Sequence, residues 1–232
     1  MQPTADGSNT LFSAAYGQTY HSTNGALVEA EHVFLRGAGV EARLQAGLPT
    51  RVLEVGLGAG LNFWVSARCG LRHNTRLDYV ALEKHPLPPE TLAQLDYGAL
   101  LGGPAAALWP RFVNLPLWQM PPGEAVWEAG PHLRLSVVIG EATTSKIPPG
   151  GYHAVYLDAF SPDVNPELWT PEFMGRLFAA LEPEGKLATY SARGTVRRAL
   201  QAAGFEVSRQ PGPPGKREMV VAVRPTAATA AK

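Results

Sequence analysis

The sequence is poor in cysteine and has no long apolar runs. Its one cysteine, Cys69, excludes an intramolecular disulfide, and we expect a buried structural thiol because it lies in an apolar helical pattern. No stretch approaches the roughly 18 consecutive apolar residues of a membrane span. The polar N-terminus has no secretory apolar run. These features favour a cytoplasmic protein that does not act in a membrane.

The sequence also lacks an excess of charge and a metal-binding pattern. Its 20 basic and 20 acidic residues give a formal net charge of zero, which argues against a nonspecific nucleic-acid coat protein. Basic residues are nevertheless concentrated between Lys186 and Arg224, either as a solvated face or as a local patch. The six histidines are scattered, and no spacing of His, Cys and carboxylates fits a metal site. We therefore expect no metal.

With 232 residues, the chain is long enough for one domain with a sizeable core. We expect an N-terminal extension over residues 1–45 that packs on this core as a cap. The main α/β domain is expected over residues 46–224. The last residues, 225–232, are expected to form a disordered tail.

Short apolar runs alternate with helical patterns in the main domain. We expect seven strands, at residues 51–55, 77–82, 133–139, 152–157, 186–190, 205–209 and 217–223. The first five alternate with helices, which is typical of an α/β fold. The last two are joined by a short Pro-Gly connection, which favours an antiparallel hairpin because a parallel crossover needs a dozen or more residues.

Two further segments carry local signals. Thr170 is expected to cap a helix over residues 170–181, with Pro171 in its first turn. The region 102–131 is rich in Pro, Gly and Trp. We expect loops and short helices there, with tryptophans that pack over the core, namely Trp109, Trp118 and Trp127.

A glycine-rich turn follows the first expected strand and precedes an apolar helix. Gly56, Gly58 and Gly60 lack the Cβ that would block a sharp turn or a close ligand. A strand, glycine turn and helix in this order predict a nucleotide pocket. Glu54, just before the turn, disfavours a pyrophosphate and favours S-adenosylmethionine, whose sulfonium and ammonium groups are cationic.

Four acidic residues fall at or beside expected strand ends, where ligands bind in open parallel sheets. Glu83 lies where a carboxylate accepts hydrogen bonds from ribose hydroxyls. Glu141, with the Ala142 backbone, is suited to the exocyclic amine and ring of adenine. Glu54 or Asp158 is suited to face the amino acid part of the cofactor. The combination is stronger evidence than the glycine turn alone.

Asp158 is the candidate catalytic residue. It opens the run Asp158-Ala-Phe160-Ser161-Pro162 after the fourth expected strand. Methyl transfer to nitrogen needs a free lone pair, whereas a primary alkylamine is mostly protonated at pH 7. A carboxylate can take part in removing the proton and then hold the remaining N–H bonds. Together with the pocket, this residue predicts a class I S-adenosylmethionine-dependent methyltransferase with a Rossmann-like, seven-stranded sheet.

Several motifs together carry a family resemblance. They lie at residues 20–22, 31–35, 53–62, 157–162, 165–170, 187–192, 196–198 and 216–219. Over roughly residues 10–224 the chain resembles the methyltransferase domain of the MnmC-like enzymes. The run 158–170 together with Lys216, Arg217 and Glu218 is specific to this pattern, whereas the glycine turn is not.

The resemblance implies a function and a set of contacts. The family uses S-adenosylmethionine to methylate the aminomethyl group on the wobble uridine of certain tRNAs. The cofactor contacts implied are the glycine turn with Glu54 and Asn62, and then Glu83, Lys84, Glu141 and Ala142. The substrate contacts implied are Tyr20, His21, Ser22, Phe160, Ser161, Pro162, Lys216 and Arg217. Arg197 and Arg198 lie side by side on a helix, so we expect at most one of them to extend the RNA contacts.

In many family members a FAD-dependent oxidase domain follows on the same chain. This sequence ends where that domain would begin, so we expect the stand-alone transferase form. A separate enzyme would then supply the aminomethyl precursor.

Three alternatives stay open at the level of sequence. An aminopropyltransferase of the spermidine synthase kind shares the sheet and the strand-end acids but has no need for a basic C-terminal turn. An RNA-binding module with a vestigial pocket is disfavoured by the intact glycine turn and Asp158. A nicotinamide enzyme is disfavoured by Glu54 and by the glycine spacing.

Overall fold

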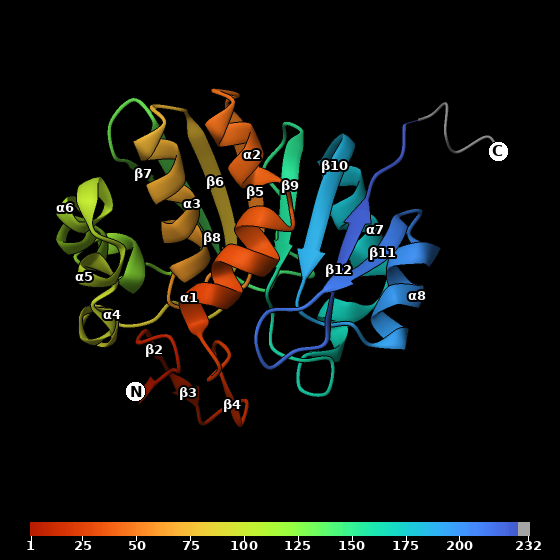
Figure 1. The fold of residues 1–232 in the computed structure, drawn as a ribbon, viewed down its shortest axis with the longest axis horizontal. Coiled ribbons are helices and arrows are strands. Elements are labelled where there is room, and N and C mark those ends of the chain that lie inside the picture. The colour runs from red at the N-terminus through yellow and green to blue at the C-terminus, as the bar shows by residue number, and fades with distance from the viewer. Residues whose placement is uncertain (227–232) are drawn as a thin grey trace.

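The computed structural model describes residues 1–226. Its centre is an eight-stranded sheet with the order β11-β12-β10-β9-β5-β6-β8-β7 (Figure 1). The strands are β5 (Thr50–Val55), β6 (Leu77–Glu83), β7 (Gly123–Glu128), β8 (Leu133–Ile139), β9 (Tyr152–Leu157), β10 (Leu181–Thr189), β11 (Glu206–Pro211) and β12 (Glu218–Val223).

Five neighbouring strands, β10, β9, β5, β6 and β8, are parallel, and β12 pairs antiparallel with both β10 and β11. The seven expected strands and the C-terminal hairpin are therefore confirmed. The parallel strands are continuous apolar runs because helices cover both of their faces. Along β5, Val52 and Leu53 enter two different core clusters, one on each side of the sheet.

The helices divide between these two faces. On one face are α1 (Ala26–Glu29), the π-helix η1 (Ala30–Arg36), α2 (Val40–Gln45), α3 (Leu61–Arg72), α4 (Pro89–Leu95), α5 (Tyr97–Leu101), α6 (Gly103–Val113) and the short η2 (Pro116–Gln119). On the other are η3 (Pro166–Trp169), α7 (Pro171–Ala180) and α8 (Gly194–Ala202). The expected cap of α7 is confirmed, because the Thr170 hydroxyl accepts a hydrogen bond from the Phe173 N–H at 3.2 Å.

One expectation about the region 102–131 is wrong. It contains the helices α6 and η2, but it also contains β7, which pairs antiparallel with β8 at the edge of the sheet. Ala125 and Trp127 of β7 are buried, while their neighbours face solvent. This alternation is too short to distinguish from a loop in a Pro- and Gly-rich context. The three tryptophans named for this region are buried as expected, at 5–7% exposure.

The N-terminal arm, defined as residues 1–25, holds two small hairpins. Its strands are β1 (Gln2–Pro3), β2 (Asn9–Thr10), β3 (Phe12–Ser13) and β4 (Gln18–Thr19). Figure 1 shows these strands in red beside the end of the sheet where the parallel strands terminate. The division of the chain at residue 45 stays a prediction, and residues 227–232 of the expected tail lie outside the described part.

Three smaller expectations concern the described residues. Cys69 is buried and unpaired, at 8% exposure, as expected for a structural thiol. Within residues 1–226, no helix combines the length and apolar character needed to cross a membrane. Over the same residues, no cluster of three or more His, Cys, Asp or Glu side chains is arranged to hold a metal ion.

Candidate active site

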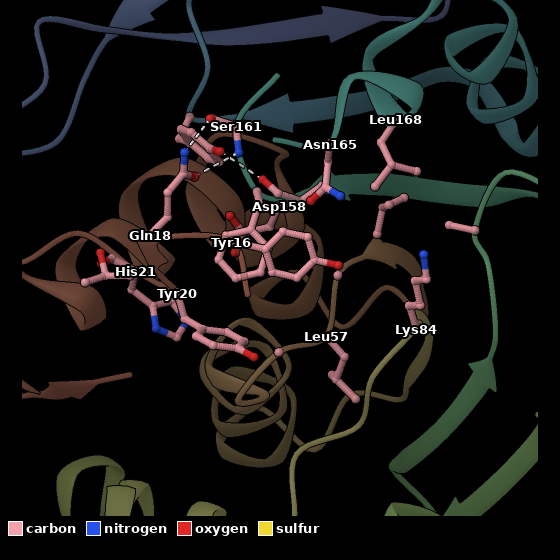
Figure 2. A pocket seen from close by; sticks show the side chains of 18 of the residues that line it. Tyr16, Gln18, Tyr20, His21, Leu57, Lys84, Asp158, Ser161, Asn165 and Leu168 are labelled. Carbon is pink, nitrogen blue, oxygen red and sulfur yellow. Dashed lines mark hydrogen bonds between the residues drawn. The ribbon is translucent and has the colours of Figure 1, made fainter. Parts of the chain in front are cut away.

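A cavity of about 480 Å³ lies at the carboxyl ends of the parallel strands. This volume is in the range of small-molecule sites in proteins. The strand ends and the glycine turn form one wall, and the N-terminal arm forms the other (Figure 2). Most of the expected site residues line it, namely Tyr20, His21, Ser22, Gly56, Gly58, Glu83, Lys84, Glu141, Ala142, Asp158, Phe160, Ser161 and Lys216.

The glycine turn packs closely against Asp158 and Tyr20, and a side chain on Gly56 or Gly58 would prevent this packing. Gly56 and Gly58 have φ angles of 88° and 52°, in the left-handed region. A Cβ on Gly56 would lie 2.9 Å from the carbonyl oxygen of Asp158. A Cβ on Gly58 would lie 2.9 Å from Cδ1 of Tyr20. Gly60 does not line the cavity; it precedes α3, and a Cβ there would meet Phe112.

Glu83 and Glu141 line the cavity at the edge of the same wall. The Glu83 carboxylate accepts hydrogen bonds from the Gly58 N–H at 2.9 Å and from the His85 N–H at 2.7 Å. Glu83 therefore fixes the glycine turn as well as lining the cavity. Lys84 forms an ion pair with Glu141 at 2.7 Å between Nζ and Oε2.

Asp158 follows β9, and its side chain reaches the cavity floor. Its Oδ2 accepts a hydrogen bond from Asn62 Nδ2 at 2.7 Å. Its Oδ1 accepts none from the described residues. Burial raises the pKa of Asp158 well above its ordinary value; the nearby Glu29 adds to this, while the Asn62 hydrogen bond and Lys216 act against it. A carboxylate with a raised pKa and one free oxygen is suited to accept a proton.

Glu54 and Asn62 lie beneath the floor and do not line the cavity. Their exposures are 0% and 2%. Asn62 Nδ2 donates to Glu54 Oε1 at 2.9 Å as well as to Asp158. Burial raises the pKa of Glu54 well above its ordinary value, and the neighbouring Asp158 adds to this.

The wall formed by the N-terminal arm (the arm wall) contacts the wall formed by the strand ends (the strand-end wall). The contacts are made by aromatic rings and by the Gln18 amide. Tyr16 stacks on Phe160 with ring centroids 4.4 Å apart, and Tyr20 meets the same ring edge-on at 5.1 Å. Gln18 Nε2 donates to Ser161 Oγ at 2.7 Å, and the Ser161 N–H donates back to Gln18 Oε1 at 3.2 Å. Of the expected run, Pro162 does not line the cavity.

Two of these arm residues, Tyr16 and Gln18, were not among the expected contacts. They lie in the aromatic segment just before the motif at residues 20–22, so their neighbourhood was visible in the sequence. Their partners were not, because Gln18 and Ser161 are 143 positions apart. No local pattern predicts a pairing over that distance.

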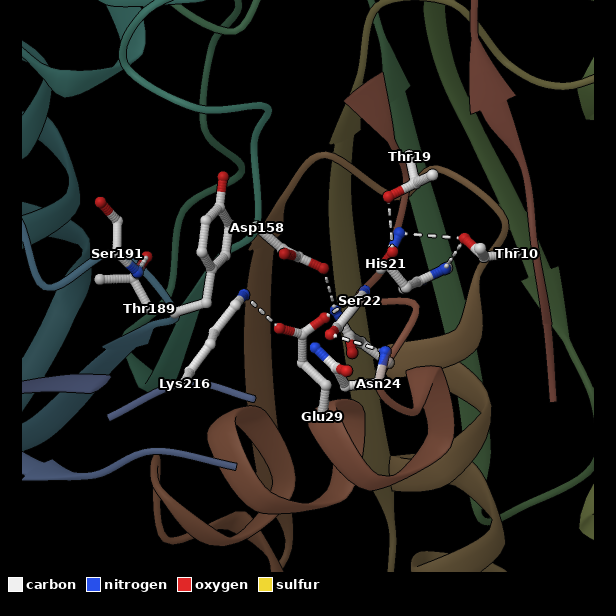
Figure 3. A network of polar contacts seen from close by, with 12 residues as sticks. Thr10, Thr19, His21, Ser22, Asn24, Glu29, Asp158, Thr189, Ser191 and Lys216 are labelled. Atoms are coloured by element: carbon white, nitrogen blue, oxygen red, sulfur yellow. Dashed lines mark hydrogen bonds and ion pairs between the residues drawn. The ribbon is translucent and has the colours of Figure 1, made fainter. Parts of the chain in front are cut away.

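A second polar network lies where the arm meets α1 (Figure 3). Glu29 is buried; it accepts hydrogen bonds from the Ser22 N–H at 2.8 Å and from Lys216 Nζ at 2.5 Å. Lys216 Nζ also lies 4.1 Å from the centre of the Tyr190 ring. The ammonium of Lys216 is therefore held inside the cavity by a carboxylate and an aromatic face.

His21 belongs to the same network but is closed off from solvent. The ring atom Nδ1 of His21 lies 3.2 Å from Thr10 Oγ1, and the backbone N–H of His21 donates to the same hydroxyl at 3.0 Å. Burial lowers the pKa of His21 to about 4. The imidazole is thus neutral at pH 7.

The basic residues expected to contact RNA differ in exposure and in whether they line the cavity. Arg217 is exposed and lies outside the cavity, unlike its neighbour Lys216. On α8, Arg198 is exposed whereas Arg197 is partly buried, in line with the expectation that at most one of them faces RNA. The structure contains no RNA, so their roles stay predictions.

The sheet order, the glycine turn and the acids at the strand ends define the class I fold of S-adenosyl-L-methionine-dependent methyltransferases. A family model described by that activity matches residues 114–225. The protein named tRNA 5-methylaminomethyl-2-thiouridine biosynthesis bifunctional protein MnmC from Ralstonia nicotianae is 40% identical over 94% of this chain and 33% of its own length. The protein of the same name from Cupriavidus necator is 36% identical over 95% of this chain and 34% of its own length.

A crystal structure of MnmC2 from Aquifex aeolicus matches 98% of this chain and 72% of its own, with a TM-score of 0.77 and 28% identity. The fold and the site therefore place the chain among S-adenosyl-L-methionine-dependent methyltransferases, and over nearly its whole length it is similar to the MnmC proteins. It spans about a third of the length of the curated relatives it matches.

The residues present fit S-adenosylmethionine. Gly56 and Gly58 line the cavity with backbone alone, at the strand end where a nucleotide-containing cofactor binds in such sheets. Glu83, Glu141 and Asp158 surround the cavity with acidic groups, which complements a cationic cofactor. Glu83, Glu141 and Ala142 line the cavity at the strand ends, and their contacts with the cofactor stay predictions.

Proposed function

We propose that this protein transfers a methyl group from S-adenosylmethionine to the 5-aminomethyl group of the wobble uridine in tRNA, giving the 5-methylaminomethyl product. The observation that carries the proposal is the free oxygen of Asp158, placed in a cavity that a glycine turn and an aromatic wall share. The names of the MnmC relatives support the same reaction.

The reaction needs a neutral amine. When bound, the cofactor supplies a methyl group that is activated by its positive sulfur. Asp158 accepts one proton from the substrate ammonium, which frees the nitrogen lone pair. A new N–C bond then forms while the C–S bond breaks, and its electron pair stays on sulfur. The product leaves as a secondary ammonium, so no second proton has to be removed.

The arm wall is suited to a single unpaired base. Tyr16 and Tyr20 flank the Phe160 ring beside Asp158. Proteins that read single-stranded RNA loops stack their splayed bases on aromatic side chains. Enzymes that act on a base take it out of the stack into such a pocket. We propose that the wobble base enters here and that Arg217, outside the cavity, meets the tRNA backbone.

The wider setting is also a proposal. The aminomethyl group has to be released by a separate reaction before this methylation, and we propose a separate enzyme for it. We also propose that the protein meets its tRNA in the cytoplasm.

The direct test uses purified protein and isotope-labelled S-adenosylmethionine. We expect label in tRNA that bears 5-aminomethyluridine, and none in tRNA without the amine. Putrescine-like amines are the control for an aminopropyltransferase or a small-amine enzyme, and should not be labelled. Nucleoside mass spectrometry of tRNA from a strain that lacks the protein should show the unmethylated amine accumulating. Label in the small amines alone would contradict the proposal.

A further inference from the structure

Three residues from separate elements form a chain of hydrogen bonds under the cavity. Glu54 is in β5, Asn62 is in the first turn of α3, and Asp158 follows β9. The Asn62 amide nitrogen donates to Glu54 Oε1 at 2.9 Å and to Asp158 Oδ2 at 2.7 Å. Both amide hydrogens of Asn62 are therefore used on carboxyl oxygens.

This arrangement fixes the orientation of the Asn62 amide. Its Oδ1 is buried and has no hydrogen-bond partner among the described residues. A flipped amide would place its oxygen against Asp158 Oδ2, which can only accept while Asp158 is ionised. Leaving the amide oxygen unsatisfied costs less than setting it against this carboxylate.

Glu54 is placed to orient a side chain and not to reach a ligand. It is completely buried, and the cavity wall does not include it. The ionisable groups that act on it are Asp158, Tyr79, Glu83 and Tyr156. No cation among the described residues pairs with it, so the protonated form is the one that burial favours.

We propose that Glu54 and Asn62 are positioning residues: Glu54 orients the Asn62 amide, and this amide holds Asp158 so that its second oxygen faces the substrate amine. This inference rests on the proposed function. It differs from the sequence-based expectation for Glu54, because the acid acts within the protein and does not contact the amino group of the cofactor.

The test compares three variants in methyl transfer to aminomethyl tRNA. Asn62→Leu keeps the size of the side chain but removes the amide, and we expect kcat to fall about 10- to 100-fold with little change in the KM for tRNA. Glu54→Gln keeps an acceptor for Asn62 without an ionisable group, so we expect nearly wild-type kcat. Glu54→Leu removes the acceptor, and its kcat should lie between those of Asn62→Leu and Glu54→Gln.

The pH profile separates positioning from a general loss of structure. The groups that face Asp158 are Glu29, Lys216 and Tyr190, besides Asn62 and Glu54. The Asn62 hydrogen bond lowers the pKa of Asp158. Removing it should move the acidic limb of kcat to higher pH in Asn62→Leu, whereas Glu54→Gln should leave that limb in place.

Ser66→Ala is the matched control. The Ser66 hydroxyl is buried and bonds to the Asn62 carbonyl oxygen and to Tyr156, but it does not touch Asp158. It should lower the melting temperature without moving the pH profile.

Two measurements keep the inference separate from the choice of substrate. Calorimetry should give the same cofactor Kd for Glu54→Gln and the wild type, and carbon-13 NMR should show the higher Asp158 pKa in Asn62→Leu. A Glu54→Gln protein that binds cofactor about tenfold more weakly, or an Asn62→Leu protein with an unchanged Asp158 pKa, would overturn it. A wild-type protein inactive on aminomethyl tRNA but with these two results would refute only the proposed function.

Discussion

The two walls of the cavity are built in different ways. The strand-end wall is set by the sheet, where β5 pairs with β6 and β9 over consecutive residues in fixed parallel register. The arm wall rests on strands of two residues each, β3 and β4, and on its contacts with the opposite wall. One wall is thus rigid because of its backbone, and the other is held in place by side chains.

Under the proposed function, this difference matches what each wall would bind. A cofactor of constant shape is best held by groups fixed on regular elements. A base that enters from a folded RNA would meet the arm wall, which is built from short segments with few backbone hydrogen bonds. The proposed proton acceptor, Asp158, belongs to the strand-end wall.

The two walls also respond to pH in opposite directions. In the arm wall, the pKa of His21 is lowered by burial, so its contribution to stability is lost as pH falls. Beneath the strand-end wall, the pKa values of Glu54 and Asp158 are raised by burial, so stability is lost as pH rises above the ordinary carboxyl range.

The largest expected effect tests whether the rigid wall carries the chemistry. Asp158→Ala should lower kcat by roughly 10²- to 10⁴-fold, the usual contribution of a general base. Cofactor affinity should stay within about an order of magnitude, because the glycine turn is unchanged. Single-turnover rates and calorimetry measure the two quantities. A fully active Asp158→Ala variant would mean that the proton acceptor is not Asp158 and has to be sought in the arm wall.

The next prediction concerns the pH sensitivity of the arm. His21 should cost the folded state up to about 3 kcal/mol as the pH falls from 6.5 towards its folded pKa of about 4. His21→Asn keeps an acceptor for Thr10 but cannot be protonated, so it should flatten this loss in urea unfolding at pH 4 to 7. Equal slopes for both proteins would show that folding does not lower the pKa of His21.

The opposite pH dependence is expected for Glu54, beneath the strand-end wall. Because burial raises the pKa of Glu54, the folded protein takes up a proton there that the unfolded chain has released at neutral pH. Glu54→Gln should therefore raise the melting temperature, and the gain should be larger at pH 8 than at pH 5. A gain in melting temperature that shrinks with rising pH would contradict the opposite pH dependence proposed for the two walls.

Paired glycine variants test the contact between the walls. Gly58→Ala brings a Cβ to 2.9 Å from the Tyr20 ring, and we expect cofactor binding to weaken about tenfold, or about 1.4 kcal/mol. Gly17→Ala in the arm has a similar positive φ of 63° but no atom within 4 Å. It should cost only about 1 kcal/mol of stability, with the cofactor Kd unchanged. Equal Kd changes would mean that backbone strain alone explains both.

The smallest expected effect separates two adjacent cations. Arg217 is exposed, and Arg217→Ala should reduce the salt slope of tRNA binding by about 1, as for one lost phosphate contact. Lys216→Met should leave that slope unchanged and lower kcat, because its ammonium is paired with Glu29 inside the cavity. Filter binding at several salt concentrations measures both. A flatter slope for Lys216→Met would place that residue in the RNA contact surface.

The comparison of walls also explains what the sequence could predict. The strand-end wall follows from local patterns, since each acid directly follows an apolar strand and the glycines mark the turn. The placement of Glu54 beneath the floor could not be predicted from the motif, because the Asn62 amide that binds it also binds Asp158, 96 positions from Asn62. Glu29 and Gln18 were missed for the same reason: their partners, Lys216 and Ser161, lie 187 and 143 positions away.

The bond between Glu29 and Lys216 also bears on the order in which the protein is made. A ribosome produces the chain from its N-terminus, so Glu29 emerges long before the residue that neutralises it. Until residue 216 has been synthesised, the first helix carries an acid whose burial has no counter-charge to offset it. The cavity is therefore completed only after residue 216 has been synthesised, and a chain that stalls earlier leaves this acid without its partner.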